Sequence, residues 1–305
     1  MKNKNNCRAF KNAVALGAVC LTLCAPSISL AWGPGGHMMT AQIAFARLNP
    51  NAKAQVKMLL AIPINPAATS ANSKDFVNAA HWADDIKSTP AFDGFKPLHF
   101  IDKPFSTDGT SLPAIPAPNI VTALRDNVKI LKTSTDKNAK AQALRFIIHF
   151  VGDIHQPLHC ATRVDRAHPA GDEGGNKVTI KITDANGNLQ SVNLHSYWDG
   201  GLESFPRGGP PPQFAQPPLS QIPPAAALAR QGNPPTDPAL KLNDPFNFQA
   251  WANESFSLAK SVAYNGMTNG TQPSAAYRNK GRKIARHRIA WGGYRLAALL
   301  NSIWP

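Results

Sequence analysis

The feature that most constrains this chain is an apolar helical segment that carries ionisable side chains. From Ile147 to Ile154 nearly every residue is apolar, but His149 and Asp153 interrupt the run. Their spacing of four residues places them on one face of a helix, one turn apart. A buried histidine and aspartate on one face are either a hydrogen-bonded core pair or two metal ligands. For an isolated pair, the core interpretation is favoured.

A second pair with the same spacing changes this balance. His195 and Asp199 are again four residues apart, and His159 follows Pro157, which ends the first helix. Imidazole and carboxylate groups are common zinc ligands, and one helix can supply two of them to one ion. Because each zinc needs three or four ligands, others must come from elsewhere in the chain. The upstream candidates are Asp84 or Asp85, His99 and His37.

Residues 1–31 have the pattern of a secretory signal peptide. A basic segment without acidic residues precedes a short apolar run, and Ser29 and Ala31 supply the small residues of a cleavage site. We expect cleavage after Ala31, so that Trp32 becomes the first residue of an exported protein, periplasmic or secreted. The apolar run is too short for a stable membrane anchor.

The mature part, residues 32–305, is basic and contains one cysteine. The formal net charge of the whole chain is +14, and loss of the four basic residues of the signal lowers it to +10. A basic surface suits polyanions such as nucleic acid or anionic membrane, although it is equally common as a source of solubility. Cys160 cannot form an internal disulfide, so packing or metals must hold the fold together.

Apolar residues recur at helical spacing through most of the mature part. Residues 103–118 contain four prolines and are expected to form a loop. Between Val178 and Val192, β-favouring residues flank an Asn-Gly turn and predict one β-hairpin. The helical pattern itself covers 40–60, 75–86, 119–131, 140–154, 246–264 and 282–303.

A segment rich in proline and glutamine, residues 205–240, interrupts this helical pattern. It is expected to be an insertion that forms a long surface excursion or a linker with little fixed structure. No alternating βα units are present. The sequence therefore predicts an all-α fold, with residues 32–305 forming a single mostly helical domain that contains one small β-hairpin.

The motifs resemble, in order and spacing, the single-strand-specific zinc nuclease and 3′-nucleotidase family of the S1/P1 type, whose relatives are the zinc-dependent phospholipases C. The resemblance covers practically the whole mature part and implies three zinc ions in a cleft. The motifs are Trp32-Gly33-Pro34-Gly35-Gly36-His37, Trp82-Ala83-Asp84-Asp85, the segment from His149 to His159, and His195-Ser196-Tyr197-Trp198-Asp199.

The resemblance also implies which residues hold each zinc. The second zinc would bind the free α-amino nitrogen and carbonyl oxygen of Trp32, together with His37 and a shared Asp153. The third would bind His159, His195 and Asp199. His155 lies outside this ligand set, and Asp84 is preferred to Asp85 because it directly follows Trp-Ala. The first zinc would be held by Asp84, His99, His149 and Asp153.

Catalytic and substrate-binding roles follow from the same resemblance. Asp153 would be shared between two metals, Asp84 would orient the nucleophile, and Lys87 would steady the phosphate. Phe100 would stack on a base and Asp102 would bond its edge, which selects single strands because a duplex hides the face of the base. The alternatives are that Lys87 is a solvated helix residue and that Phe100 belongs to the core.

The predicted function is a zinc-dependent endonuclease that hydrolyses single-stranded DNA and RNA to 5′-phosphate products, with 3′-nucleotidase activity. Its substrates would be single-stranded nucleic acid and 3′-nucleotides, and the protein is expected to be a monomer. A zinc-dependent phospholipase C is the main alternative, since the same metals can face a lipid phosphodiester. A non-catalytic zinc-binding exported protein is the second, but no expected ligand is missing.

Overall fold

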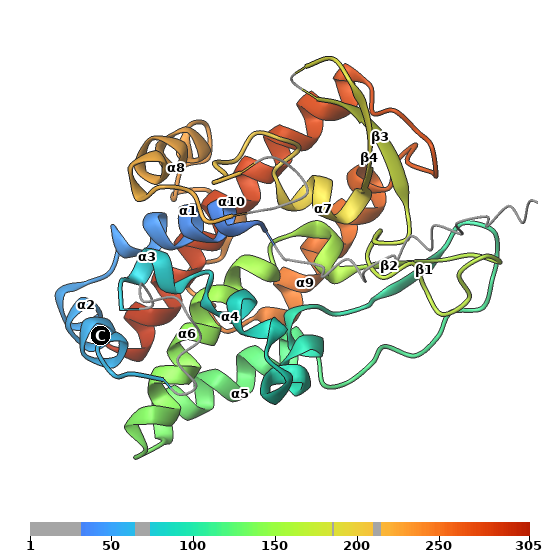
Figure 1. Cartoon of the computed structure of the whole chain (residues 1–305). Coiled ribbons are helices and arrows are strands. Elements are labelled where there is room, and N and C mark those ends of the chain that lie inside the picture. Colours follow the sequence, from blue (N-terminus) through green and yellow to red (C-terminus); the bar gives the residue numbers. More distant parts are fainter. Residues whose placement is uncertain (1–31, 65–73, 185, 210–214) are drawn as a thin grey trace, which may run out of the picture.

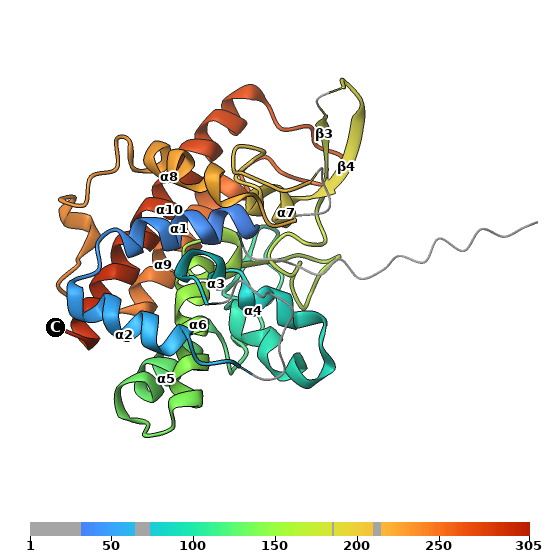
Figure 2. The same cartoon turned by 60° about the vertical axis from the view of Figure 1, so that its left-hand side comes forward.

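The computed structural model describes residues 32–64, 74–184, 186–209 and 215–305, so the predicted signal peptide lies outside the described residues. Most of the described chain is helical (Figures 1 and 2), which confirms the predicted all-α class. The α-helices are α1 (Pro34–Phe45), α2 (Pro50–Leu60), α3 (Phe76–Ala79), α4 (Trp82–Asp85), α5 (Ile120–Thr133), α6 (Lys137–Asp153), α7 (Leu194–Asp199), α8 (Ile222–Arg230), α9 (Phe248–Leu258) and α10 (Ala275–Ile303).

Shorter elements connect these helices. The 3-10 helices are η1 (Ile86–Ser88), η2 (Pro90–His99), η3 (Pro157–Cys160), η4 (Leu219–Gln221) and η5 (Pro238–Leu240), and a π-helical turn, η6 (Ala259–Ala263), continues α9. The strands are β1 (Pro104–Ser106), β2 (Thr162–Val164), β3 (Thr179–Thr183) and β4 (Leu189–Asn193). In the described part of the chain, no helix is both long and apolar enough to span a membrane.

Helix α6 forms the centre of the molecule, with α1 and α10 against it (Figures 1 and 2). Every residue from Ala143 to Asp153 is buried, as expected of a helix whose surface is covered on all sides. Close packing of α10 on α1 depends on Gly293, where an added β-carbon would lie 2.6 Å from the Cβ atom of Ile43. The end of α6 that carries His149 and Asp153 therefore lies between α1, α4 and η2.

Two predicted helices are each divided in the structure. The 40–60 helix breaks between α1 and α2, where Asn49 caps α2 by accepting a hydrogen bond from the amide of Ala52 (2.7 Å). The 75–86 helix is α3, α4 and η1 instead. At that break the carbonyl oxygen of Ala80 accepts a hydrogen bond from Nδ1 of His149 (2.7 Å), a contact that no local pattern reveals.

The predicted β-hairpin is confirmed. β3 and β4 pair antiparallel, with Thr179 opposite Asn193 and Thr183 opposite Leu189. The turn is closed by Asp184, whose carboxylate accepts hydrogen bonds from the amides of Asn186 and Asn188. A second sheet, the parallel pair of β1 and β2, was not predicted, because strands of three residues are too short to show a periodic pattern.

The expectation of little fixed structure in 205–240 is wrong for the described residues 219–230, which form η4 and α8. Pro223 and Pro224 fall in the first turn of α8, where no backbone amide is needed for hydrogen bonding within the helix. Ile222, Ala226 and Ala229 are buried in a cluster with side chains of α1 and α10. The segment is therefore a packed part of the helical layer (Figure 1).

A charge network of two buried arginines and one partly exposed glutamate joins the last two long helices to the segment after α6. Glu254 of α9 accepts hydrogen bonds from Arg288 (2.9 Å) and from Arg295 (2.6 and 2.8 Å) of α10. The same arginines hold His155: Arg288 donates to its carbonyl oxygen, and Arg295 lies 3.0 Å from its Nε2. His155 therefore has a structural position, beside but outside the candidate ligands.

Substitution of Glu254 tests this network. Glu254→Ala leaves two buried guanidinium groups without their carboxylate, and we expect the free energy of unfolding to fall by about 3–5 kcal/mol. Urea denaturation measures the change. Asp93→Ala removes an exposed ion pair with Lys96 and should cost less than about 1 kcal/mol. Equal losses in the two variants would show that the network does not stabilise the fold.

Candidate metal centre

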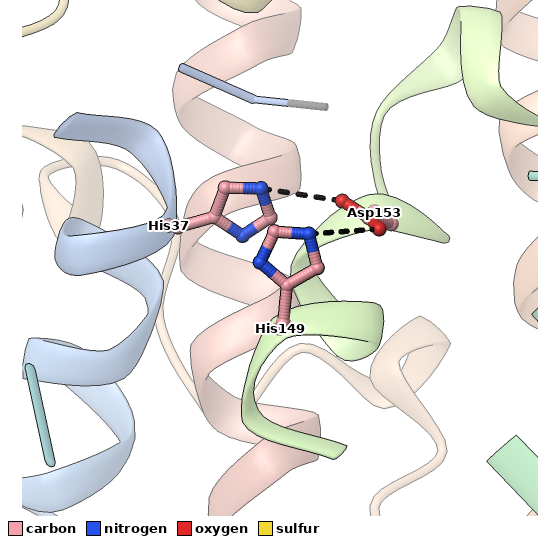
Figure 3. A group of neighbouring side chains, drawn as sticks. All are labelled: His37, His149 and Asp153. Atoms are coloured by element: carbon pink, nitrogen blue, oxygen red, sulfur yellow. Dashed lines mark ion pairs between the residues drawn. The ribbon is translucent and has the colours of Figure 1, made fainter. Parts of the chain in front are cut away.

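The first group of facing side chains joins α1 to α6. Figure 3 shows His37 of α1 and His149 of α6 pointing toward Asp153. Nε2 of His37 lies 3.2 Å from Oδ1 of Asp153, and Nε2 of His149 lies 3.2 Å from Oδ2 of the same carboxylate. The two imidazole rings stack with their centroids 3.9 Å apart. All three side chains are fully buried.

A second group shares His149 with the first. It adds Asp84 of α4 and His99, the last residue of η2. Nδ1 of His99 lies 3.1 Å from Nε2 of His149, and Oδ1 of Asp84 lies 3.5 Å from that same nitrogen. Nδ1 of His99 is also 2.9 Å from Oδ2 of Asp153, so Asp153 reaches both groups.

A third group lies where η3 meets α7. His159 of η3 faces His195 and Asp199 of α7, and the two imidazole rings have centroids 4.7 Å apart. The amide of Gly33 donates a hydrogen bond to the carbonyl oxygen of Asp199 (2.9 Å), which holds the chain next to Trp32 beside this group. All predicted side-chain ligands therefore fall into these three buried groups, whereas the ligand atoms predicted for Trp32 belong to its backbone.

A pocket of about 150 Å³ opens beside the third group. Phe100 and Asp102 line it, as does His195. Leu158, Glu173, Gly174 and Asn176 also line the pocket and were not predicted. Burial and the nearby carboxylate of Asp172 raise the pKa of Asp102 to about 6.

Several known proteins are similar in sequence to this chain. The S1/P1 nuclease profile matches residues 32–305. The chain belongs to the S1/P1 nuclease family. Endonuclease 3 of Arabidopsis thaliana is 28% identical over 90% of each chain, and nuclease S1 of Aspergillus oryzae is 27% identical over 92% of this chain and 95% of its own. Nuclease P1 of Penicillium citrinum is 30% identical over 55% of this chain and 57% of its own.

Membership of the S1/P1 nuclease family makes this protein a hydrolase of phosphodiester bonds from a zinc-dependent, secreted family. The three groups suit zinc because nitrogen and oxygen atoms that can bind a metal face one another in each group. Nε2 of His159, Nε2 of His195 and Oδ2 of Asp199 are buried and have no hydrogen-bond partner among the described residues. Buried polar atoms normally have a hydrogen-bond partner. A cluster of buried nitrogen and oxygen atoms without such partners therefore fits the ligands of a bound cation.

In three of the histidines, the ring nitrogen that faces away from the group is held by a hydrogen bond to the backbone. Nδ1 of each donates a hydrogen bond to a carbonyl oxygen, so that in the neutral imidazole the lone pair lies on Nε2. The orienting partner of a metal-bound histidine is commonly of this kind. The pairs are His149 with Ala80 (2.7 Å), His159 with His99 (2.8 Å) and His195 with Gly174 (2.8 Å).

Protonation also suits metal binding at most of these residues. Burial lowers the pKa of His37 to about 4 and that of His99 to about 3, so both imidazoles are neutral near pH 7. His149 differs, because Asp153 and Asp84 outweigh the opposing effect of burial and raise its pKa to about 10. Burial opposes ionisation of Asp153, but the interactions with His149, His37 and His99 together outweigh it and hold the pKa of this carboxylate well below the ordinary value, so it stays ionised.

Two further contacts distinguish neighbouring candidates. Lys87 is buried, and its Nζ lies 2.6 Å from Oδ1 of Asp84, so Lys87 is not a solvated helix residue. Asp84 is fully buried within the second group, whereas Asp85 is partly exposed and lies 3.0 Å from Nε2 of His81. The structure thus brings Asp84, rather than Asp85, to the other ligands.

Gln156 is a residue that the sequence interpretation missed. Its Nε2 donates a hydrogen bond to Oδ1 of Asp199 (2.7 Å), and its side-chain oxygen accepts one from the amide of Leu158 (2.6 Å). It thereby caps η3, which carries His159, and holds a carboxylate of α7 at the same time. Its place directly before Pro157 marks a helix start, but the partner 43 residues away has no local signal.

The close approach of α1 to α6 depends on Gly152, where an added β-carbon would lie 2.6 Å from Nδ1 of His37. We expect Gly152→Ala to displace this imidazole and to lower both the zinc content and the activity by at least about half. Elemental analysis of the purified protein measures the zinc. Gly94→Ala, which meets no atom within 4 Å, is the matched control. Full zinc content in both variants would mean that His37 is not a ligand.

Proposed function

We propose that the mature chain is a monomeric, exported, zinc-dependent endonuclease that cleaves single-stranded DNA and RNA to 5′-phosphate products and also removes 3′-phosphates from nucleotides. The observation that carries the proposal is the combination of three buried histidine–aspartate groups with a pocket that presents an aromatic ring. Membership of the S1/P1 nuclease family supports the reaction type. The names nuclease S1 and nuclease P1 among its relatives support the substrate class.

The proposed zinc ligands are those given by the family resemblance. Asp84, His99, His149 and Asp153 would hold one ion, and Asp153 would be shared with a second ion held by His37 and Trp32. His159, His195 and Asp199 would hold the third. Zinc at these residues would supply a Lewis acid that lowers the pKa of a coordinated water and neutralises charge on the phosphate.

The chain's own residues position the reactants. Asp84 accepts a hydrogen bond from the attacking water and orients it, while the ammonium group of Lys87 stabilises the negative charge of the phosphate. The water oxygen forms a bond to phosphorus, and the bond from phosphorus to the 3′-oxygen breaks. The water gives up one proton as its oxygen bonds to phosphorus, and the 3′-oxygen takes up one proton as it leaves, so that one water is added in total and the phosphate remains on the 5′ side. This outcome gives the 5′-phosphate products.

The pocket accounts for the choice of single strands. Phe100 stacks on a nucleobase and Asp102 bonds to its edge, with the reactive phosphate near His195. Stacking on an aromatic ring is worth about 1–3 kcal/mol per base, and the base must be unpaired for the ring to reach it. The positive charge of the mature part, +10 after loss of the signal, attracts the polyanion.

Metal removal and substrate comparison test the proposal directly. After chelation we expect hydrolysis of single-stranded DNA and RNA to fall at least about a hundredfold and to return with added zinc. His149→Ala should lose zinc and activity together, whereas His168→Ala, which removes an imidazole paired with Asp165 away from the three groups, should lose neither. Cleavage of phosphatidylcholine alone would identify a phospholipase C. No hydrolysis of any of these substrates would indicate a non-catalytic zinc protein.

The proposed ligation by Trp32 requires a free α-amino group, which exists only after cleavage behind Ala31. A mature chain that keeps one residue before Trp32 should bind about one zinc fewer per molecule than a chain that begins at Trp32. An extra residue after the exposed C-terminal Pro305 serves as the control. Elemental analysis together with mass spectrometry of the first peptide measures both quantities, and equal zinc content would remove Trp32 from the site.

A further inference from the structure

A fully buried carboxylate, Asp172, directly precedes Glu173, one of the unpredicted residues of the pocket lining. Its Oδ1 accepts three hydrogen bonds: from the amide of Arg163 in β2 (2.9 Å), from the amide of Gly175 (3.1 Å) and from the hydroxyl of Tyr264 (2.7 Å). None of these four residues lines the pocket. Asp172 thus ties the turn that follows it to β2 and to the end of η6.

The turn that Asp172 anchors has an unfavourable backbone. Glu173, Gly174 and Gly175 all have positive φ, at 56°, 63° and 85°. Glutamate rarely adopts this conformation, and a run of such residues persists only where the surroundings hold it. Backbone hydrogen bonds from Asp172 to Arg163 (3.0 Å) and from Lys177 to Asp172 (3.1 Å) close the turn at its base. The shape of the turn therefore depends on Asp172.

The same turn serves both the pocket and the third group. Glu173, Gly174 and Asn176 line the pocket together with Phe100. The carbonyl oxygen of Gly174 also accepts the hydrogen bond from Nδ1 of His195. A shift of the turn would move the wall against which a base is held.

Of the residues in this arrangement, Tyr264 is the one whose hydrogen bond can be removed with the smallest change in packing. Its ring is buried, packs edge-on against Phe105 with centroids 5.1 Å apart, and lies beneath the guanidinium of Arg163. Burial and Asp172 raise the pKa of Tyr264 well above its ordinary value, so the hydroxyl remains a hydrogen-bond donor. Phenylalanine would keep the ring packing and remove only that donor.

We propose that Tyr264 and Asp172 form a brace that positions the 173–176 turn and thereby sets how tightly the pocket holds a nucleobase. Tyr264 is a positioning residue: it acts through Asp172 and touches neither the base nor the ligands. The inference rests on the proposed function, in that the pocket must receive a base. It predicts an effect on substrate binding that is separate from the metal chemistry.

The test compares Tyr264→Phe with the unaltered protein on two oligonucleotides of equal length, one of deoxyadenosine and one with abasic sites. We expect KM for the deoxyadenosine oligonucleotide to rise roughly threefold to tenfold, the effect of losing one hydrogen bond. The value of kcat, the zinc content and the kinetics on the abasic oligonucleotide should change less than about twofold. Tyr294→Phe, which loses a hydroxyl bond to Asn233 in another part of the fold, is the matched control.

A Phe100→Ala variant separates failure of the brace from failure of the pocket. If Phe100→Ala raises KM for the deoxyadenosine oligonucleotide and Tyr264→Phe does not, the pocket binds a base and the brace is wrong. If neither variant changes KM, the base pocket of the proposed function is wrong, and the brace with it. Equal effects of Tyr264→Phe on both oligonucleotides, or a loss of zinc, would assign Tyr264 to support of the third group and overturn the proposal. Asp172→Asn should act in the same direction as Tyr264→Phe and more strongly.

Discussion

The site depends on one carboxylate at the buried end of α6. Asp153 presents Oδ1 to Nε2 of His37 at 3.2 Å and Oδ2 to Nδ1 of His99 at 2.9 Å, while His149 lies one helical turn away. These contacts fix the distances between α1, η2 and α6. The packing follows the same requirement, since Gly152 and Gly293 let the long helices approach α1 closely. The packing of the helices therefore determines the geometry of the candidate metal centre.

Such a cluster would be costly in a core without a cation. Burying imidazoles and carboxylates away from water destabilises a fold unless the groups are paired, and several donor atoms here have no hydrogen-bond partner among the described residues. In the proposed zinc-bound state those atoms become ligands, and metal binding adds to the free energy of unfolding. Cys160 is a free thiol, so metal cross-links would take the place that disulfides have in many exported proteins.

Local spacing was enough to predict part of this site. The four-residue interval places His149 with Asp153, and His195 with Asp199, on one helical face, because helical geometry determines it. The all-α class and the β-hairpin also follow from periodicity and turn residues. Gln156, the 173–176 turn and the pairing of β1 with β2 depend on partners far away in sequence, and no local pattern carries that information. Helix α8 was missed for another reason: the density of proline and glutamine indicated a surface excursion or a linker, although Pro223 and Pro224 occupy the first turn of a helix.

One error in the helix prediction, the continuous helix expected for 75–86, falls at the site for a physical reason. A regular helix uses its own carbonyl oxygens, so a carbonyl that orients an imidazole must come from a break in regular structure. Ala80 lies between α3 and α4, His99 ends η2, and Gly174 sits in a positive-φ turn. Each of these carbonyls holds Nδ1 of one histidine. A 75–86 segment with the continuous helix predicted for it would have no free carbonyl at Ala80 to orient His149.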